Sequence, residues 1–119
     1  MASIESKTFD QPDETRTPDK TRVDVVRVGG AEVGRFTFQP GWRWSECIKP
    51  VVGTDLCQTD HVGYLESGRL TVRHEQDGTE VTLSPGDAYH IAPGHDAWVE
   101  GEEAVVALEF KSAATYAKP

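Results

Sequence analysis

Short apolar runs separated by turn residues cover most of the chain from Val23 onward. Glycine and proline, adjacent in Pro85-Gly86 and Pro93-Gly94, interrupt these runs at short and fairly regular intervals. The runs are enriched in β-branched, aromatic and other apolar residues, and this pattern predicts an all-β sandwich or barrel. The expected strands span residues 23–28, 31–38, 42–48, 56–66, 69–75, 79–83, 87–91, 96–100 and 103–110.

A hairpin around Asp77-Gly78 is the clearest single element of the pattern. The Asp-Gly pair tolerates the positive φ angles that a tight hairpin turn requires. Before this turn, Leu70 and Val72 alternate with polar residues, so one face of their strand is expected to be buried. Helical periodicity over three turns is not seen in the folded part, and residues 112–116 are expected to form one turn at most.

Residues 1–22 have a different composition from the rest of the chain. They are rich in Ser, Thr, Asp, Glu, Lys and Pro, and Ile4 and Phe9 are their large apolar residues. Such a segment buries too little apolar surface to offset the entropy lost on ordering. We therefore expect a flexible polar N-terminal arm over residues 1–22, dispensable for folding, and a single domain over residues 23–119.

The composition narrows the classes of function. A length of 119 residues suits one hydrophobic core. The net charge of −8 argues against nucleic acid and anionic membranes as partners, because both attract clustered Lys and Arg. No apolar run has the length of a membrane span or of a signal-peptide core, so we expect a cytoplasmic protein. Its two cysteines, Cys47 and Cys57, are too few for a secreted disulfide framework.

Two segments resemble the two sequence motifs of the cupin superfamily. The first motif has the form G-x5-H-x-H-x3-4-E-x6-G, and Ser67-Gly68 followed by Arg69-Leu70 resembles its closing part. The second has the form G-x5-P-x-G-x2-H-x3-N, and the residues from Pro85 to His95 resemble it. The resemblance covers roughly residues 41–98, about half of the chain. It implies an antiparallel jelly-roll β-barrel that pairs as a homodimer.

The same resemblance implies where a metal would bind. In the family, the paired His, the Glu and the final His point inward and hold one divalent metal. Counting back from Gly68 places His61 at the Glu position and Cys57 at the second His position, if residues 49–54 are an insertion. The final His position falls on Ala97, but His95 keeps the same strand parity.

The resemblance therefore implies a metal site formed by Cys57, His61 and His95, with Cys47 or Asp55 as a fourth ligand. Thiolate and imidazole ligands suit Zn, Fe, Ni or Cu. Asp96, beside His95, is a candidate to orient that imidazole. Two alternatives remain open. The chain is a cupin that has lost its metal, or Cys57 forms a reactive thiolate with a histidine. The remaining histidines, His74 and His90, are given no site role.

Aromatic residues suggest a second kind of site. Trp42 and Trp44 stand two residues apart and are expected to share one strand face, and Trp98 follows the second motif. Large aromatics often form the core, but the run from Pro40 to Glu46 is too polar for an ordinary core strand. We therefore predict a ligand pocket or subunit interface. The predicted pocket residues are Trp42, Trp44, Tyr64 and Trp98.

Two functions follow from these observations. In the first, the barrel is a binding module for a small organic ligand, with or without a divalent metal. In the second, the chain is a metal-dependent cupin enzyme that oxidises, isomerises or hydrolyses a small molecule. The altered metal-binding motif favours the binding module.

Overall fold

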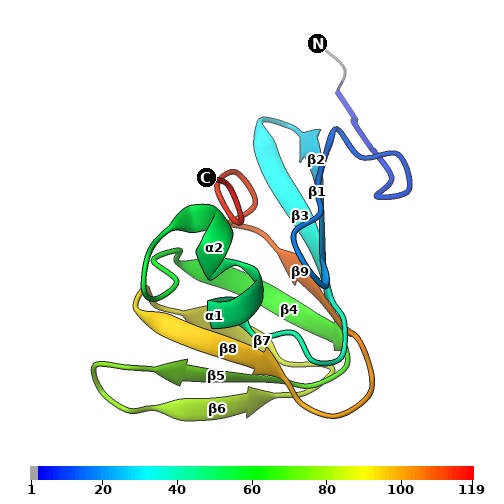
Figure 1. The fold of residues 1–119 in the computed structure, drawn as a ribbon. Coiled ribbons are helices and arrows are strands. Elements are labelled where there is room, and N and C mark those ends of the chain that lie inside the picture. The colour runs from blue at the N-terminus through cyan, green and yellow to red at the C-terminus, as the bar shows by residue number, and fades with distance from the viewer. Residues whose placement is uncertain (1–2) are drawn as a thin grey trace.

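The computed structural model describes residues 3–119, which form two antiparallel β-sheets and two short helices (Figure 1). The strands are β1 (Glu14–Arg16), β2 (Thr21–Val28), β3 (Ala31–Phe38), β4 (His61–Ser67), β5 (Leu70–His74), β6 (Glu80–Leu83), β7 (Ala88–Ile91), β8 (His95–Val99) and β9 (Val105–Glu109). The larger sheet has the order β1-β2-β3-β9-β4-β7, and the smaller has the order β6-β5-β8. The all-β, antiparallel prediction is confirmed.

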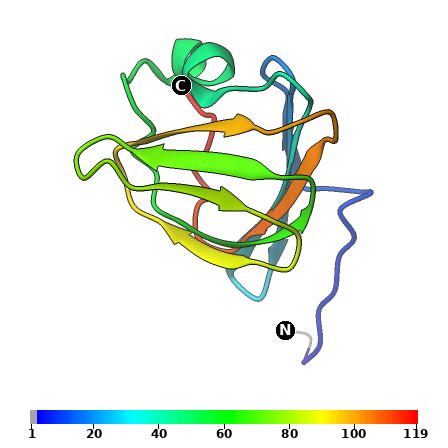
Figure 2. The same cartoon turned by 90° about the horizontal axis from the view of Figure 1, so that it is seen from below.

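The core lies between the inward faces of the two sheets. Val23 and Leu65 contribute from the larger sheet, and Val72 and Val99 contribute from the smaller one. Along β4, buried and exposed residues alternate strictly from His61 to Leu65, as expected for a strand with one solvated face. The view from below shows the smaller sheet facing the larger one (Figure 2).

The two motif glycines occupy the turn positions that the resemblance implies. Gly68 has φ +77° and Gly94 has φ +97°, both in the left-handed region that favours glycine. A Cβ atom added to Gly68 would come within 2.5 Å of the Ala104 carbonyl oxygen, so a side chain cannot enter there. The hairpin between β5 and β6 likewise turns at Asp77-Gly78, as predicted.

The predicted strand over residues 42–48 is wrong, because a short helix replaces most of it and a second helix follows. Residues Trp44–Cys47 form α1 and Lys49–Val52 form α2. Strand pairing ends with a single bridge between Arg43 and Trp98, after which the chain turns away from the sheet. The Ser45 N–H donates to Asp96 Oδ1 at 3.1 Å, which satisfies an amide in the first turn of α1.

The region between β3 and β4 differs from the sequence prediction in further ways. Residues 49–52 belong to α2, and Gly53, with φ +81°, ends it in the left-handed conformation common after helices. The predicted strand over 56–66 begins only at His61. Trp42 and Trp44 therefore do not share a strand face, since Trp44 opens α1.

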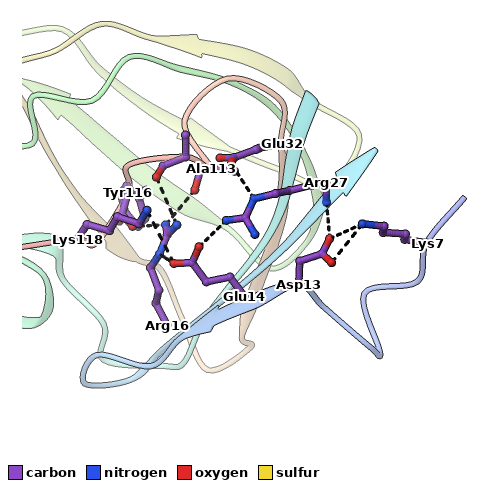
Figure 3. A network of polar contacts seen from close by, with 10 residues as sticks. Lys7, Asp13, Glu14, Arg16, Arg27, Glu32, Ala113, Tyr116 and Lys118 are labelled. Carbon is purple, nitrogen blue, oxygen red and sulfur yellow. Dashed lines mark hydrogen bonds and ion pairs between the residues drawn. The ribbon is translucent and has the colours of Figure 1, made fainter. Parts of the chain in front are cut away.

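Strand β1 lies wholly, and β2 partly, within the predicted arm. Glu14 pairs with Val25 across β1 and β2, and β2 begins at Thr21. Glu14 of β1 pairs with Arg27 of β2, which also pairs with Glu32 of β3 (Figure 3). The strand signal of β1 is weak because its three residues are Glu, Thr and Arg. Flexibility of the residues before β1 stays a prediction.

Neither of the two helices found within residues 3–119 is long and apolar enough to cross a membrane. The residues after β9 turn back toward α1 and α2 (Figures 1 and 2). Within this segment the amides of Thr115 and Tyr116 donate to the carbonyl of Ser112, which confirms the single turn predicted over residues 112–116.

Candidate metal centre

Cys57, His61 and His95 converge between the two sheets, as the motif spacing predicts. His61 opens β4 of the larger sheet, and His95 opens β8 of the smaller sheet. The Cys57 N–H donates to the His95 carbonyl at 2.8 Å, which fixes the loop before β4 against β8. All three side chains are buried, and one ligand atom from each lies within 4.8 Å of the others.

Hydrogen bonds fix which imidazole nitrogens face the cluster. His95 Nδ1 donates to the Ala92 carbonyl at 2.7 Å, so its Nε2 keeps a lone pair. His61 Nδ1 donates to Glu109 Oε1 at 2.8 Å, and its Nε2 lies 3.7 Å from Cys57 Sγ. A carboxylate or carbonyl behind each imidazole is the usual arrangement for metal-binding histidines.

Glu109 is the most heavily hydrogen-bonded side chain near the cluster. It is 2% exposed, and its Oε1 accepts hydrogen bonds from His61 and from Ser112 Oγ, the latter at 2.6 Å. Its Oε2 accepts a hydrogen bond from the Tyr89 hydroxyl. A buried carboxylate needs such donors, because desolvation otherwise disfavours its charged form. Glu109 therefore anchors the orientation of His61.

Gly63 leaves room for the Tyr89 ring beside Glu109. A Cβ atom built on Gly63 would come within 2.6 Å of the Tyr89 hydroxyl oxygen and within 2.5 Å of the Leu108 carbonyl oxygen. Glycine at this inward-facing position of β4 thus permits the contact between Tyr89 and Glu109. The side chains on three strands, β4, β7 and β9, meet at this point.

The electrostatic environment favours ionised Cys57. Burial opposes ionisation, but hydrogen bonds and charges from His61 and His95 outweigh it and lower the pKa of the Cys57 thiol to about 6. Burial also opposes the charged form of His61, while Cys57 and Glu109 together raise the pKa of its imidazole. A thiolate, rather than a thiol, is the form that binds metals and reacts as a nucleophile.

The three side chains fit a transition-metal ion. One thiolate sulfur and two imidazole nitrogens are ligands that zinc and related metals prefer. In tetrahedral zinc sites the ligands lie about 2.0–2.3 Å from the metal, hence roughly 3.3–3.8 Å from each other. The separation of 3.7 Å between Cys57 Sγ and His61 Nε2 lies within this range, and the three ligand atoms all lie within 4.8 Å of one another.

The predicted additional members of the site lie elsewhere. Cys47 is buried beside Asp19, with 3.9 Å between its Sγ and the carboxylate. The Asp55 side chain is 97% exposed and pairs with Lys49. Asp96 accepts hydrogen bonds from Arg43 and the Ser45 amide, whereas His95 bonds the Ala92 carbonyl instead. The cluster thus offers three candidate ligands, and Asp96 does not orient His95.

The four aromatic residues predicted for a ligand pocket are not gathered in one place. Trp42 is core: its ring stacks on Phe38 and its Nε1 donates to Thr21 Oγ1 at 2.9 Å. Tyr64 is 40% exposed on the face of β4 opposite to His61. Trp98 lies under the guanidinium of Arg43. Trp44 is the member of this set that borders a pocket next to the cluster.

That pocket has a volume of about 150 Å³, and we call it the C-terminal pocket. Cys57 forms part of its wall, so a molecule inside it would reach the cluster directly. The remaining walls come from the two helices, the loop before β4 and the C-terminal residues. They comprise Trp44, Ile48, Val52, Thr54, Gln58, Thr59, Thr115, Tyr116, Ala117 and Lys118.

A larger pocket of about 260 Å³ lies between the edge strands β6 and β7. Val72, Val81 and Ile91 line it, together with His74 and Tyr89. Its connection to the cluster is indirect and runs through Tyr89 and Glu109. We regard the smaller pocket as the relevant one because Cys57 belongs to its wall.

Glu109, Tyr89 and Tyr116 are residues of the centre that sequence reasoning missed. Tyr116 lies with its ring centroid 5.4 Å from that of His61. Strand parity offered one signal, since Tyr89 alternates with the exposed His90 and must face inward. No local pattern marks Glu109 or Tyr116, because both reach His61 only through the order of strands in the larger sheet.

Comparisons with known proteins place the fold but not the activity. No family model matches the chain, and no curated protein matches it significantly. Similar solved structures include a cupin-like protein from Thermotoga maritima, with 15% identity, a TM-score of 0.54, and coverage of 83% of this chain and 72% of that one. KdgF from a Halomonas species has 20% identity, a TM-score of 0.56 and coverage of 83% and 87%.

The polyketide cyclase RemF from Streptomyces resistomycificus is also similar, with 14% identity, a TM-score of 0.64, and coverage of 92% of this chain and 80% of that one. The likeness to the cupin-like protein shows that this chain has a cupin-like fold, as predicted. At such low identities the likeness concerns the fold alone.

Proposed function

We propose that this protein is a metal-binding cupin in which Cys57, His61 and His95 hold one divalent transition metal. The observation that carries the proposal is the convergence of three buried ligand atoms, with both imidazoles oriented from behind. A metal ion would take the place of the proton between Cys57 Sγ and His61 Nε2, and the hydrogen-bond acceptors behind both imidazoles are those usual for metal-binding histidines. In this proposal the two sheets form the jelly-roll barrel that surrounds the ion.

Zinc is the metal we favour, with Fe, Ni and Cu as competitors. Three protein ligands leave one tetrahedral position for water or a small molecule, which distinguishes such a centre from a closed structural site. A bound metal would supply Lewis acidity at that position. Glu109 would keep His61 in the tautomer that presents Nε2, and Tyr89 and Ser112 would keep the Glu109 carboxylate in place.

Metal binding can be tested by titrating the protein, stripped with chelator, with Zn(II), Ni(II), Cu(II) and Fe(II). We expect one equivalent to bind, with Cys57→Ala and His61→Ala lowering affinity by about 100-fold or more, as loss of a ligand from a three-ligand site implies. Co(II) substitution should give the absorption of a thiolate–metal bond, and Cys57→Ala should remove it. Cys47→Ala is the matched control, since Cys47 is buried outside the cluster.

We further propose that a small organic ligand binds in the C-terminal pocket beside the metal. Trp44 and Tyr116 supply aromatic surface, Lys118 supplies a positive charge, and Cys57 borders the site of the ion. Within the described residues, Trp44 Nε1 is buried without a hydrogen-bond partner. Small carboxylates match this combination of charge, aromatic surface and metal.

The ligand proposal and its enzymatic alternative are separated by product analysis. A binding module should retain acetate, benzoate or a similar carboxylate unchanged, with Trp44→Phe and Lys118→Gln weakening retention. Turnover of such a compound by the metal-loaded protein, abolished by His61→Ala, would instead establish the enzyme. Retention that is equal with and without metal would contradict a ligand site next to the ion.

A further inference from the structure

The C-terminal residues cover the candidate metal centre. We define the C-terminal turn as residues 112–118. Within it the Tyr116 ring packs edge-on against the His61 ring and stacks on Phe36, with 4.6 Å between the last two centroids. Tyr116 and Lys118 also line the C-terminal pocket. Access to the centre from this pocket therefore depends on where the C-terminal turn lies.

Arg16 of β1 holds the C-terminal turn in place (Figure 3). Its Nη1 donates to the Ala113 carbonyl at 2.9 Å and to the Tyr116 carbonyl at 2.6 Å. Its Nη2 donates to the Ala114 carbonyl at 3.4 Å. One guanidinium thus satisfies three carbonyls of a turn that belongs to no strand or regular helix.

The Arg16 side chain is itself held rigidly. It is 9% exposed, and its Nε donates to Glu14 Oε2 at 2.7 Å. The other carboxylate oxygen of Glu14 accepts from Arg27, which also pairs with Glu32. Arg16 is therefore placed by its neighbours, and a planar guanidinium fixed in this way matches several carbonyls at once.

The C-terminal turn has a second anchor at its base. Ser112 Oγ donates to Glu109, the carboxylate that orients His61. Loss of Arg16 would leave this anchor, the stacking of Tyr116 on Phe36 and the weak pairing of Lys118 with Glu14 at 3.9 Å, but would remove the guanidinium that holds the carbonyls of the turn. The turn could then pivot about Ser112 and withdraw Tyr116 from His61.

We infer that Arg16 is a positioning residue that keeps the C-terminal turn closed over the metal centre and thereby limits exchange of the bound metal. This inference rests on the metal site proposed above. It gives the polar segment before β2 a role at a buried site, although Arg16 and Tyr116 are 100 positions apart in sequence.

The test compares Arg16→Gln with Arg27→Gln. Both variants remove an arginine that bonds Glu14, but among residues 3–119 the hydrogen-bond partners of the Arg27 side chain are Glu14 and Glu32, not the C-terminal turn. Each protein is loaded with Zn(II), and its release to an excess of chelating dye is timed. We expect Arg16→Gln to accelerate release by about tenfold or more, and Arg27→Gln to change it by less than about twofold. Arg16→Lys should restore part of the slow release.

Hydrogen exchange supplies the readout that separates this inference from the metal proposal. Arg16→Gln should lose protection at the amides of Thr115 and Tyr116 while β4 and β9 stay protected. If Arg16→Gln does not fold, a chain ending at Ala113 replaces it and should show the same fast release. Equal release rates for Arg16→Gln and wild type would overturn the inference alone. Absence of zinc binding by the wild type, with normal protection of the turn, would overturn the proposed metal function.

Discussion

The metal centre and the network around Glu14 and Arg16 are both dense in polar contacts, yet they differ in how those contacts are satisfied. In the network, carboxylates face guanidinium groups, and Arg16 also faces backbone carbonyls (Figure 3). At the centre, the outer nitrogens of the imidazoles are satisfied, but a sulfur and two inner nitrogens face each other. The first region is complete in itself, whereas in our proposal a cation would complete the second.

The two regions also differ in how far their side chains are exposed to solvent. The Glu14 side chain is 28% exposed, while Glu109 is 2% exposed and the cluster residues are buried. Exposed ion pairs contribute little to stability because water and salt screen them. A buried polar group stabilises the fold when it is fully hydrogen-bonded and destabilises it strongly when it has no partner. The comparison indicates that partner chemistry and burial, rather than the number of hydrogen bonds, distinguish a structural network from a binding site.

Removing the central carboxylate of each region should give the largest difference in unfolding free energy between the two regions. Glu109→Ala leaves His61, Ser112 and Tyr89 without their acceptor in a buried site, so we expect a loss of about 3 kcal/mol or more of unfolding free energy. Glu14→Ala should cost about 1 kcal/mol or less. Urea denaturation measures both. Similar costs for the two variants would abolish the distinction drawn between the regions.

Zn(II) should stabilise the protein through the candidate metal centre and not through the network around Glu14 and Arg16. At a free Zn(II) concentration about 100 times the dissociation constant, binding to the folded state adds about 2.7 kcal/mol of unfolding free energy. We expect this gain in wild type and in Glu14→Ala, and its loss in Cys57→Ala. Thermal unfolding with and without Zn(II) provides the measurement. A gain that survives in Cys57→Ala would place the ion elsewhere.

Truncation should locate where the N-terminal segment becomes structural. Removing residues 1–12 should cost about 1 kcal/mol or less, because its contacts, such as the ion pair of Lys7 with Asp13, are largely exposed. Removing residues 1–16 also deletes β1 and the carbonyl contacts of Arg16, and should cost on the order of 2 kcal/mol more. Equal effects of the two truncations would show that Arg16 contributes nothing.

The smallest expected effect is the pH dependence contributed by Glu14. Hydrogen bonds from Arg16 and Arg27 outweigh burial and lower the pKa of its carboxyl group from 4.5 to about 2. A lowered folded-state pKa stabilises the fold above pH 4.5, and this contribution is lost as pH falls from about 4.5 to 2. The stability difference between wild type and Glu14→Gln should therefore shrink over that interval. A difference that stays constant would mean that the ion pairs are energetically silent.

Local sequence accounts for much of the fold and for the ligand set. Strand periodicity located most strands within a few residues, and Gly68 and Gly94 took the left-handed conformations that the motifs imply. Cys57 and His61 were identifiable because they stand at motif spacings, and His95 because it keeps the strand parity of the final motif position. The helices over residues 44–52 escaped this reasoning, since each has only four residues and no periodicity can show in so short a run.

Only the tertiary structure shows which side chains surround Cys57, His61 and His95. Glu109 reaches His61 because β9 lies beside β4, and Arg16 reaches the Tyr116 carbonyl because β1 lies near the C-terminal turn. Periodicity records which face of a strand is buried, but it carries no information about which strands are neighbours. The sequence by itself therefore determined an all-β chain with a candidate ligand triad. Strand order and register determined that Glu109 and Tyr116 lie against His61 and that Arg16 bonds the turn that carries Tyr116.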